Sequence, residues 1–255
     1  MTATLNFATA PGHQVLAAAG KKILRPGGVK ATEQLFNWAN FQPEDTVLEL
    51  AASFGESAIA IAKRFNVRVV GIEKNPDSVA KARANIKAAG LEDRITIIEG
   101  DIYSLDKITQ KFDYVLAEAI LTMQSDQGKV KVLAAIKKHL SAKGKFLSHE
   151  LLVRENKLDV HKNLSRSIKV NANPLTTSEW ATACQNAGLT IEQQKTGTMG
   201  LLNFGQMLRD EGLLGTIKFS WNVLINSNLR PRVLQMRRSF KQQRQNIGYI
   251  VFMAQ

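Results

Sequence analysis

The feature that most constrains the fold is an alternation, between residues 46 and 153, of short apolar runs with segments of helical periodicity. The apolar runs are TVLELAA, RVVGIE, ITIIEGD, FDYVLAEAI and GKFLSHELLV. They are rich in β-branched residues and almost continuously apolar, as parallel strands buried on both faces are. The segments between them repeat apolar residues at helical spacing. This order predicts an α/β fold with a doubly wound, Rossmann-like and mostly parallel sheet.

Turn residues agree with this division of the chain. Pro76 fits the first turn of a helix, with Asn75 or Asp77 near its cap, and Gly90 fits the end of the same helix. The run SAKGK, at residues 141–145, predicts a tight turn before the fifth strand. Each predicted break therefore falls between a strand and a helix.

The flanking segments complete a single domain over residues 1–255. Residues 1–42 predict an N-terminal helical lid of two helices joined at Pro26-Gly27-Gly28, and residues 43–153 form the core. Residues 154–203 predict a polar connector as far as Pro174, a helix and a sixth strand, LTIEQQKTGTM. A basic helical cap at 204–246 precedes a last apolar strand at 247–255, which we expect to return to the same sheet as its seventh strand. The cap is then an insertion.

The charge of the chain is uneven. Its formal net charge is +12, and residues 151–255 hold 14 basic and 6 acidic side chains. Such a surface attracts nucleic acid, anionic lipid or an anionic small molecule, and charge alone does not choose between them. We expect a cytoplasmic protein, since neither a membrane-spanning run nor a secretion signal is present, and the single Cys184 predicts a buried thiol rather than a disulfide.

Ligands of open α/β sheets bind beyond the carboxyl ends of the strands, so these ends hold the candidate site residues. Each of the five predicted core strands ends near an ionisable side chain. The ends are Glu49 with the loop Ala51 to Gly55, Glu73 with Lys74, Gly100-Asp101-Ile102, Ala117-Glu118-Ala119, and Ser148-His149-Glu150.

On these residues, positions 46–153 resemble the class I S-adenosylmethionine-dependent methyltransferases of the small-molecule type, similar to methyltransferase type 11 and type 25 domains. The resemblance implies that Glu49 binds the methionine ammonium, Glu73 the ribose hydroxyls and Asp101 the adenine, with Ile102 against the ring. Lys74, Gly100, Glu118 and Arg25 are the other residues expected near this cofactor. Carboxylates suit a ligand that carries an ammonium, a sulfonium and hydroxyls.

The first loop departs from the family pattern of three glycines. Ala51 and Ser53 occupy the first two glycine positions, and only Gly55 is retained. A non-glycine residue forced to positive φ costs about 1–2 kcal/mol. We therefore expect a modified cofactor loop.

Each carboxylate also has a plain structural interpretation. Glu49 could cap the next helix, Glu73 could pair with Lys74 or Lys81, and Asp101 could be a turn residue. Arg25 could bind the cofactor carboxylate or an anionic acceptor, or remain a solvated surface charge.

Methyl transfer is an in-line displacement for which positioning and exclusion of water suffice, so a general base is optional. Glu118, Thr122, His149 and Glu150 are the candidates, and His149 and Glu118 are the two we select, although His149 could instead make structural hydrogen bonds. No spacing of His, Cys or paired carboxylates indicates a metal.

We expect S-adenosylmethionine as the cofactor and a small anionic or apolar metabolite as the acceptor. An RNA acceptor is the alternative, with Arg230, Arg232, Arg237 and Arg238 on phosphates. An NPPY-like tetrad is missing after the fourth strand, which disfavours methylation of base amino groups. A quinone or lipid acceptor also suits the apolar cap, and a non-catalytic binding module with a degenerate loop remains open. A nicotinamide dehydrogenase is disfavoured because GxGxxG is absent.

Overall fold

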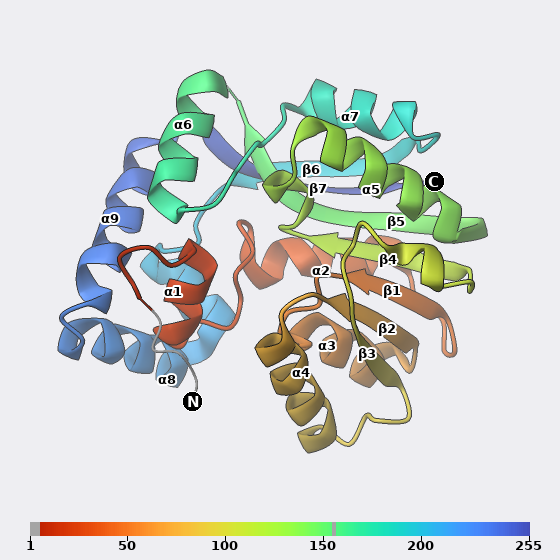
Figure 1. Cartoon of the computed structure of the whole chain (residues 1–255), viewed down its shortest axis with the longest axis horizontal. Coiled ribbons are helices and arrows are strands. Elements are labelled where there is room, and N and C mark those ends of the chain that lie inside the picture. Colours follow the sequence, from red (N-terminus) through yellow and green to blue (C-terminus); the bar gives the residue numbers. More distant parts are fainter. Residues whose placement is uncertain (1–5, 155–156) are drawn as a thin grey trace.

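A computed structural model of the chain describes residues 6–154 and 157–255, so residues 1–5 of the predicted lid and 155–156 of the predicted connector lie outside the described residues. Its centre is one seven-stranded sheet with the strand order β3-β2-β1-β4-β5-β7-β6 (Figure 1). The strands are β1 (Thr46–Leu50), β2 (Arg68–Glu73), β3 (Ile95–Glu99), β4 (Phe112–Glu118), β5 (Leu140–Val153), β6 (Ile191–Thr198) and β7 (Ile247–Ala254).

The strand directions confirm the predicted sheet. The pairs among β1 to β5 are parallel, and β7 lies antiparallel between β5 and β6. The last strand therefore returns to the same sheet, between β5 and the edge strand β6, and the preceding basic helices are an insertion between β6 and β7, as expected. The helix after β2 also begins as predicted, because the Asn75 side chain accepts the Ser78 N–H at 2.9 Å.

Helices cover both faces of the sheet. On one face α5 (Asp126–His139) and α7 (Thr177–Asn186) bury Ile136, Trp180 and the free thiol of Cys184 against the strands. On the other face α2 (Gly28–Ala39), α3 (Glu56–Phe65) and α4 (Pro76–Ala88) form a second core. Apolar side chains therefore point to both sides of the strands, as the continuous apolar runs predict.

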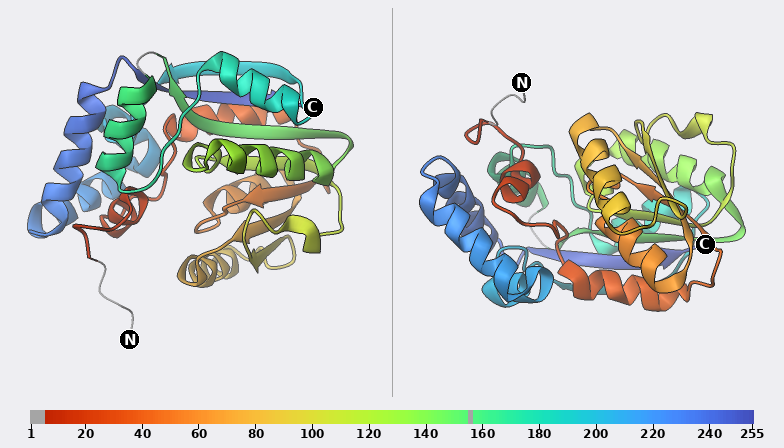
Figure 2. Two further views of the ribbon diagram at one scale, coloured as in Figure 1. Left: turned by 45° about the horizontal axis from the view of Figure 1, so that its top comes forward. Right: turned by 90° about the horizontal axis from the view of Figure 1, so that it is seen from below.

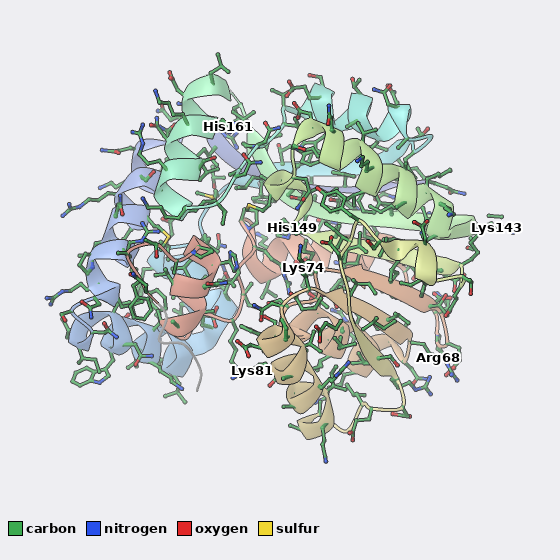
Figure 3. All side chains as sticks on the ribbon, in the orientation of Figure 1. Arg68, Lys74, Lys81, Lys143, His149 and His161 are labelled. Atoms are coloured by element: carbon green, nitrogen blue, oxygen red, sulfur yellow. The ribbon has the colours of Figure 1, made fainter. Side chains whose placement is uncertain are left out.

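Four helices form a helical lobe at one end of the sheet: α1 (Gly12–Ala18), α6 (Lys157–Ile168), α8 (Phe204–Ile225) and α9 (Leu229–Gln242). The views in Figure 2 set this lobe apart from the layer of strands. Arg68 and Lys143, near the starts of β2 and β5, lie at the opposite end (Figure 3). The carboxyl ends of the parallel strands therefore face the lobe.

Three expectations need correction. Residues 157–168 form α6 rather than a polar connector, because Val160, Leu164 and Ile168 recur every fourth residue and are buried in the lobe. The fifth strand begins at Leu140, which pairs with Phe112, and the register then shifts before Tyr114 pairs with Lys145, so SAKGK forms an irregularity within the strand rather than a turn before it. Arg232 is buried and donates to the carbonyls of Phe7 and Ser167, so it cannot bind phosphate at the surface.

The loop from β1 to α3 is where the sheet meets the predicted cofactor. Ala51, Ser53 and Gly55 all adopt left-handed backbone, with φ of 55°, 51° and 76°. The Ala52 N–H donates to the Ile72 carbonyl at 2.9 Å and thereby ties the loop to β2. Two non-glycine residues thus hold the conformation that glycine adopts without strain.

We predict that Ala51→Gly and Ser53→Gly each raise the free energy of unfolding by about 0.5–1 kcal/mol, because relief of left-handed strain exceeds the entropy that glycine adds to the unfolded chain. Denaturant unfolding measures this. The matched control is Ala52→Gly, at a buried residue without positive φ, which should lower stability by about 1 kcal/mol. Equal losses in all three variants would contradict the interpretation.

Candidate active site

The predicted cofactor carboxylates lie at one edge of the sheet, on three adjacent strands. Glu49 is on β1, Glu73 ends β2, and Asp101 follows β3, which pairs with β2 through Glu99 opposite Glu73. The sequence placed these residues at strand ends. The sheet order brings the three ends together.

The Glu73 carboxylate binds the backbone of the loop after β1 and, in the described part of the chain, does not pair with a lysine. Its two carboxylate oxygens accept the backbone N–H groups of Ser53 and Asn75, each at 2.8 Å. Among the ion pairs of the described residues, neither Lys74 nor Lys81 pairs with Glu73, and Lys74 instead binds Asp101. The Glu73 carboxylate therefore fixes the corner at which both β1 and β2 end.

Asp101 forms the neighbouring corner. It accepts from Lys74 Nζ at 2.7 Å and from the Tyr103 N–H at 3.0 Å. The hydrogen bond from Lys74 lowers the pKa of Asp101, so the group is ionised at neutral pH. Gly100 donates to the Glu73 carbonyl at 2.9 Å, whereas Ile102 is buried in the core beneath the corner. The polar residues predicted to bind the cofactor at the ends of β2 and β3 therefore lie next to each other.

Glu49 is buried, and its Oε2 lacks a hydrogen-bond partner in the described protein. Burial and the nearby charge of Glu118 raise its pKa to about 8. Buried polar atoms are almost always paired, so an unpartnered carboxylate oxygen marks a place for a cationic or donor group. An ammonium such as that of S-adenosylmethionine fits this donor set.

Arg25 and Glu118 form a buried ion pair between the lid and the end of β4. Arg25 Nε lies 3.0 Å from Glu118 Oε2, and the guanidinium also donates to Thr32 and Ser57, at 3.1 and 2.6 Å. Both hydroxyls donate in turn to Glu118, at 2.5 and 2.6 Å. Although burial opposes ionisation, Arg25 and the bonds from His149 and Ser57 lower the pKa of Glu118 to about 2. Arg25 is therefore not a solvated surface charge.

His149 belongs to the same network and lies at the centre of the molecule (Figure 3). Its Nε2 accepts the Gly27 N–H at 3.0 Å, and its Nδ1 lies 3.2 Å from Thr32 Oγ1 and 3.6 Å from Glu118 Oε1. Burial lowers the pKa of His149, so the ring is neutral, with its proton on Nδ1. Both ring nitrogens of His149 therefore contact the N-terminal segment, Nε2 through Gly27 and Nδ1 through Thr32.

Two further candidates bind each other. Glu150 accepts the N–H and hydroxyl of Thr122, at 2.9 and 2.6 Å, and the N–H of Leu121 at 2.9 Å. Burial raises the pKa of Glu150 to about 7 despite these bonds. This carboxyl therefore fixes the turn after β4.

A cavity of about 70 Å³ lies between the sheet and the helical lobe. It is lined by apolar residues of the lid, of β5 and of α6 and α9, and His13 is its one ionisable side chain. Ala119, which directly follows Glu118, forms part of the wall. Partial burial lowers the pKa of His13, and the negative charge of Glu73 opposes this shift. His13 therefore lines the cavity within electrostatic reach of Glu73.

Sequence reasoning missed His13, Thr32 and Ser57. Ser57 lies in the first turn of α3, after Gly55, and Thr32 lies in the second turn of α2, after Gly28, and their nearness to helix starts could have suggested them. His13 carries no such signal, because Glu73 is remote in sequence. In the described part of the chain no group of three or more His, Cys, Asp or Glu residues could hold a metal ion.

Comparison with known proteins places the chain in a family. Residues 41–206 match the family described as methyltransferase domain. An uncharacterised protein of Haemophilus influenzae is 34% identical over 96% of this chain and 97% of its own length. A 23S rRNA uracil-C(5)-methyltransferase of Photobacterium angustum is 33% identical, over 38% of this chain and 45% of that protein.

Solved structures share the fold. A methyltransferase from Geobacter sulfurreducens, in complex with S-adenosyl-L-homocysteine, superposes with a TM-score of 0.70 at 16% identity, over 95% of this chain and 97% of that one. Together with the family match, this confirms the class I methyltransferase that the strand-end carboxylates predict. The chain belongs to the methyltransferase domain family and carries its domain on a Rossmann-like sheet.

Proposed function

We propose that this enzyme methylates a small apolar acceptor, held in the cavity between the sheet and the helical lobe, with S-adenosylmethionine as the methyl donor. The observation that carries the proposal is the lining of the cavity. Side chains such as Leu16, Met123, Leu151 and Met236 surround it, and His13 alone is ionisable. An apolar wall with few polar groups is typical of sites for small organic molecules, and the volume of about 70 Å³ restricts the acceptor to a very small one.

The cofactor would be held by Glu49, Glu73 and Asp101. The unpartnered Glu49 Oε2 suits the ammonium, the two oxygens of Glu73 suit the ribose hydroxyls, and Asp101 lies at the next corner. When bound, S-adenosylmethionine supplies a methyl group activated by a positively charged sulfur. The carboxylates of this chain complement that charge.

His13 is the residue that we propose as the proton acceptor. Because its pKa is lowered, the imidazole is mostly unprotonated at neutral pH and can remove a proton from the substrate that receives the methyl group in the cavity. We assign His149 and Glu118, the residues selected from the sequence, to positioning instead. Their atoms are bonded to Gly27, Thr32 and Arg25, which hold the lid over the cavity. The apolar wall excludes water from the reacting groups.

A methylation screen with isotopically labelled S-adenosylmethionine tests this function. We expect small apolar hydroxyl compounds to be methylated and bulk RNA and protein to remain unlabelled. His13→Gln should lower kcat by about 100-fold without changing cofactor affinity, since a general base contributes about that much. His161→Gln, on α6, is the control. Labelling of RNA alone would refute the small apolar acceptor. An unchanged kcat in His13→Gln would refute the role of His13 as the proton acceptor.

Cofactor binding should release a proton from Glu49. With its pKa raised from 4.5 to about 8, the ligand-free carboxyl is protonated at pH 7, and a bound ammonium favours its ionised form. Between pH 4.5 and about 8, Glu49 is protonated in the ligand-free folded protein but ionised in the unfolded chain. The free energy of unfolding should therefore fall as the pH rises through this range.

Calorimetric titration with S-adenosylmethionine in buffers of different ionisation enthalpy measures this release. Wild-type protein should release more protons at pH 7 than Glu49→Gln, and the variant should bind about tenfold or more weakly, because a charge-assisted bond is lost. Glu56→Gln, at the neighbouring helix start, is the control. Equal proton release by wild type and Glu49→Gln would exclude Glu49 as the ammonium ligand.

A further inference from the structure

The last part of α8 is apolar on two opposite sides. Gly212 breaks the helix with φ of 69° and ψ of 177°, and beyond it Thr216 and Phe219 are buried in the helical lobe. The other side carries large apolar residues that are all more than half exposed. They are Leu213, Leu214, Ile217, Trp221, Leu224 and Ile225, here called the outer face of α8.

These residues form one continuous surface. At 3.6 residues per turn, all six lie within an arc of about 120° around the helix. A helix that is apolar all round is normally buried, and contiguous exposed apolar surface marks an interaction site. The outer face is therefore built to be covered, and nothing in residues 6–154 and 157–255 covers it.

The charges around the outer face have one sign. The acidic residues of α8 and α9 are Asp210 and Glu211, whose side chains are 1% and 2% exposed and pair with Lys21 Nζ at 3.6 and 3.2 Å. The exposed charged residues of α8, α9 and the turn after α9 are all cations: Arg209, Lys218, Arg230, Arg237, Arg238, Lys241 and Arg244. Two copies of this surface would repel each other, whereas an anionic surface complements it.

A second cavity indicates the same kind of partner. It lies between α8 and α9, has a volume of about 200 Å³, and is lined mainly by apolar residues such as Phe204, Met207 and Val223. Arg237 is its one charged lining residue. Apolar space beside a single guanidinium matches a molecule with an apolar chain and an anionic head.

We propose that the outer face of α8 binds the surface of an anionic phospholipid bilayer, with its apolar side chains at the acyl boundary and the cations of α8 and α9 at the phosphates. Exposed apolar side chains that include a tryptophan, flanked by cations, are typical of helices that lie in such an interface. Among the described residues no helix is long and apolar enough to cross a membrane, so the binding is peripheral.

This position would also serve the acceptor cavity. α9 contributes Met236 and Phe240 to the cavity wall and Arg237 and Arg238 to the cationic surface. Figures 1 and 2 show α8 and α9 at the outer edge of the lobe, away from β1 to β3. The bilayer proposal itself depends on the surface and not on the proposed acceptor.

Vesicle sedimentation of the full-length protein tests the proposal. We expect wild-type protein to sediment with vesicles of phosphatidylcholine mixed with phosphatidylglycerol, and hardly at all with phosphatidylcholine alone. The double variant Leu214→Gln/Trp221→Gln should bind at least about tenfold more weakly, because two apolar side chains no longer leave water. Both positions are highly exposed, at 83% and 60%, so the fold should tolerate the changes. Leu158→Gln on α6, 87% exposed, is the matched control.

Two further measurements separate the outcomes. Tryptophan emission of wild-type protein should shift to shorter wavelength on the anionic vesicles, and this shift should be lost in Trp221→Gln, since Trp180 is buried already and Trp38 packs against the core between α2 and the sheet. Failure to bind the mixed vesicles, or equal binding to both kinds, would overturn the proposal. A dimer in analytical ultracentrifugation that the double variant dissociates would overturn it in favour of an interface between copies.

Discussion

The buried ion pair between Arg25 and Glu118 is the interaction on which the site depends. It joins the lid, which precedes the sheet in sequence, to the carboxyl end of a central strand, and Thr32, Ser57 and His149 complete its hydrogen bonds. Removing one partner of a buried pair leaves an uncompensated charge at a cost of about 3–5 kcal/mol. The position of the segment around Arg25 against the end of β4 therefore depends on this pair. Burial raises the pKa of Glu49 most, and the charges of Glu118 and Arg25 act on it in opposite directions.

Two kinds of surface meet at this junction. On the side of β1 to β3 the strand ends present carboxylates, one of which is buried with an oxygen left unpartnered. On the side of β4 and β5 the lid and the helical lobe enclose an apolar cavity. A positively charged methyl donor and an apolar methyl acceptor, as proposed above, require such different surroundings. The insertion between β6 and β7 supplies the outer wall of the cavity and, through α8, the apolar face exposed to solvent.

Much of the fold follows from local patterns. The β-branched runs predict the parallel strands because strands buried on both faces have few other sequences available. The strand ends predict Glu49, Glu73 and Asp101 because topology alone brings such ends together. The partners of the site residues are not local: Glu118 binds Thr32, which lies 86 residues earlier, and the charge of Glu73 acts on His13, which is also remote in sequence. A sequence shows the charge of Glu118 but not that Arg25 and Thr32 satisfy it. The miss at α6 has a different cause, since its four apolar residues were present but outnumbered by polar ones.

Hydrogen exchange of wild-type protein and Arg25→Met tests most directly whether this ion pair holds the lid. If it does, amides of α1 and of residues 20–28 in the variant should exchange about 100-fold faster or more, as the loss of a buried pair allows, while amides of β1, of β4 and of α2, which packs in the core on the sheet, keep their protection. The segment before α2 would then open over an intact sheet. Unchanged protection of α1 and residues 20–28, or an equal loss over this segment and the sheet, would contradict the account.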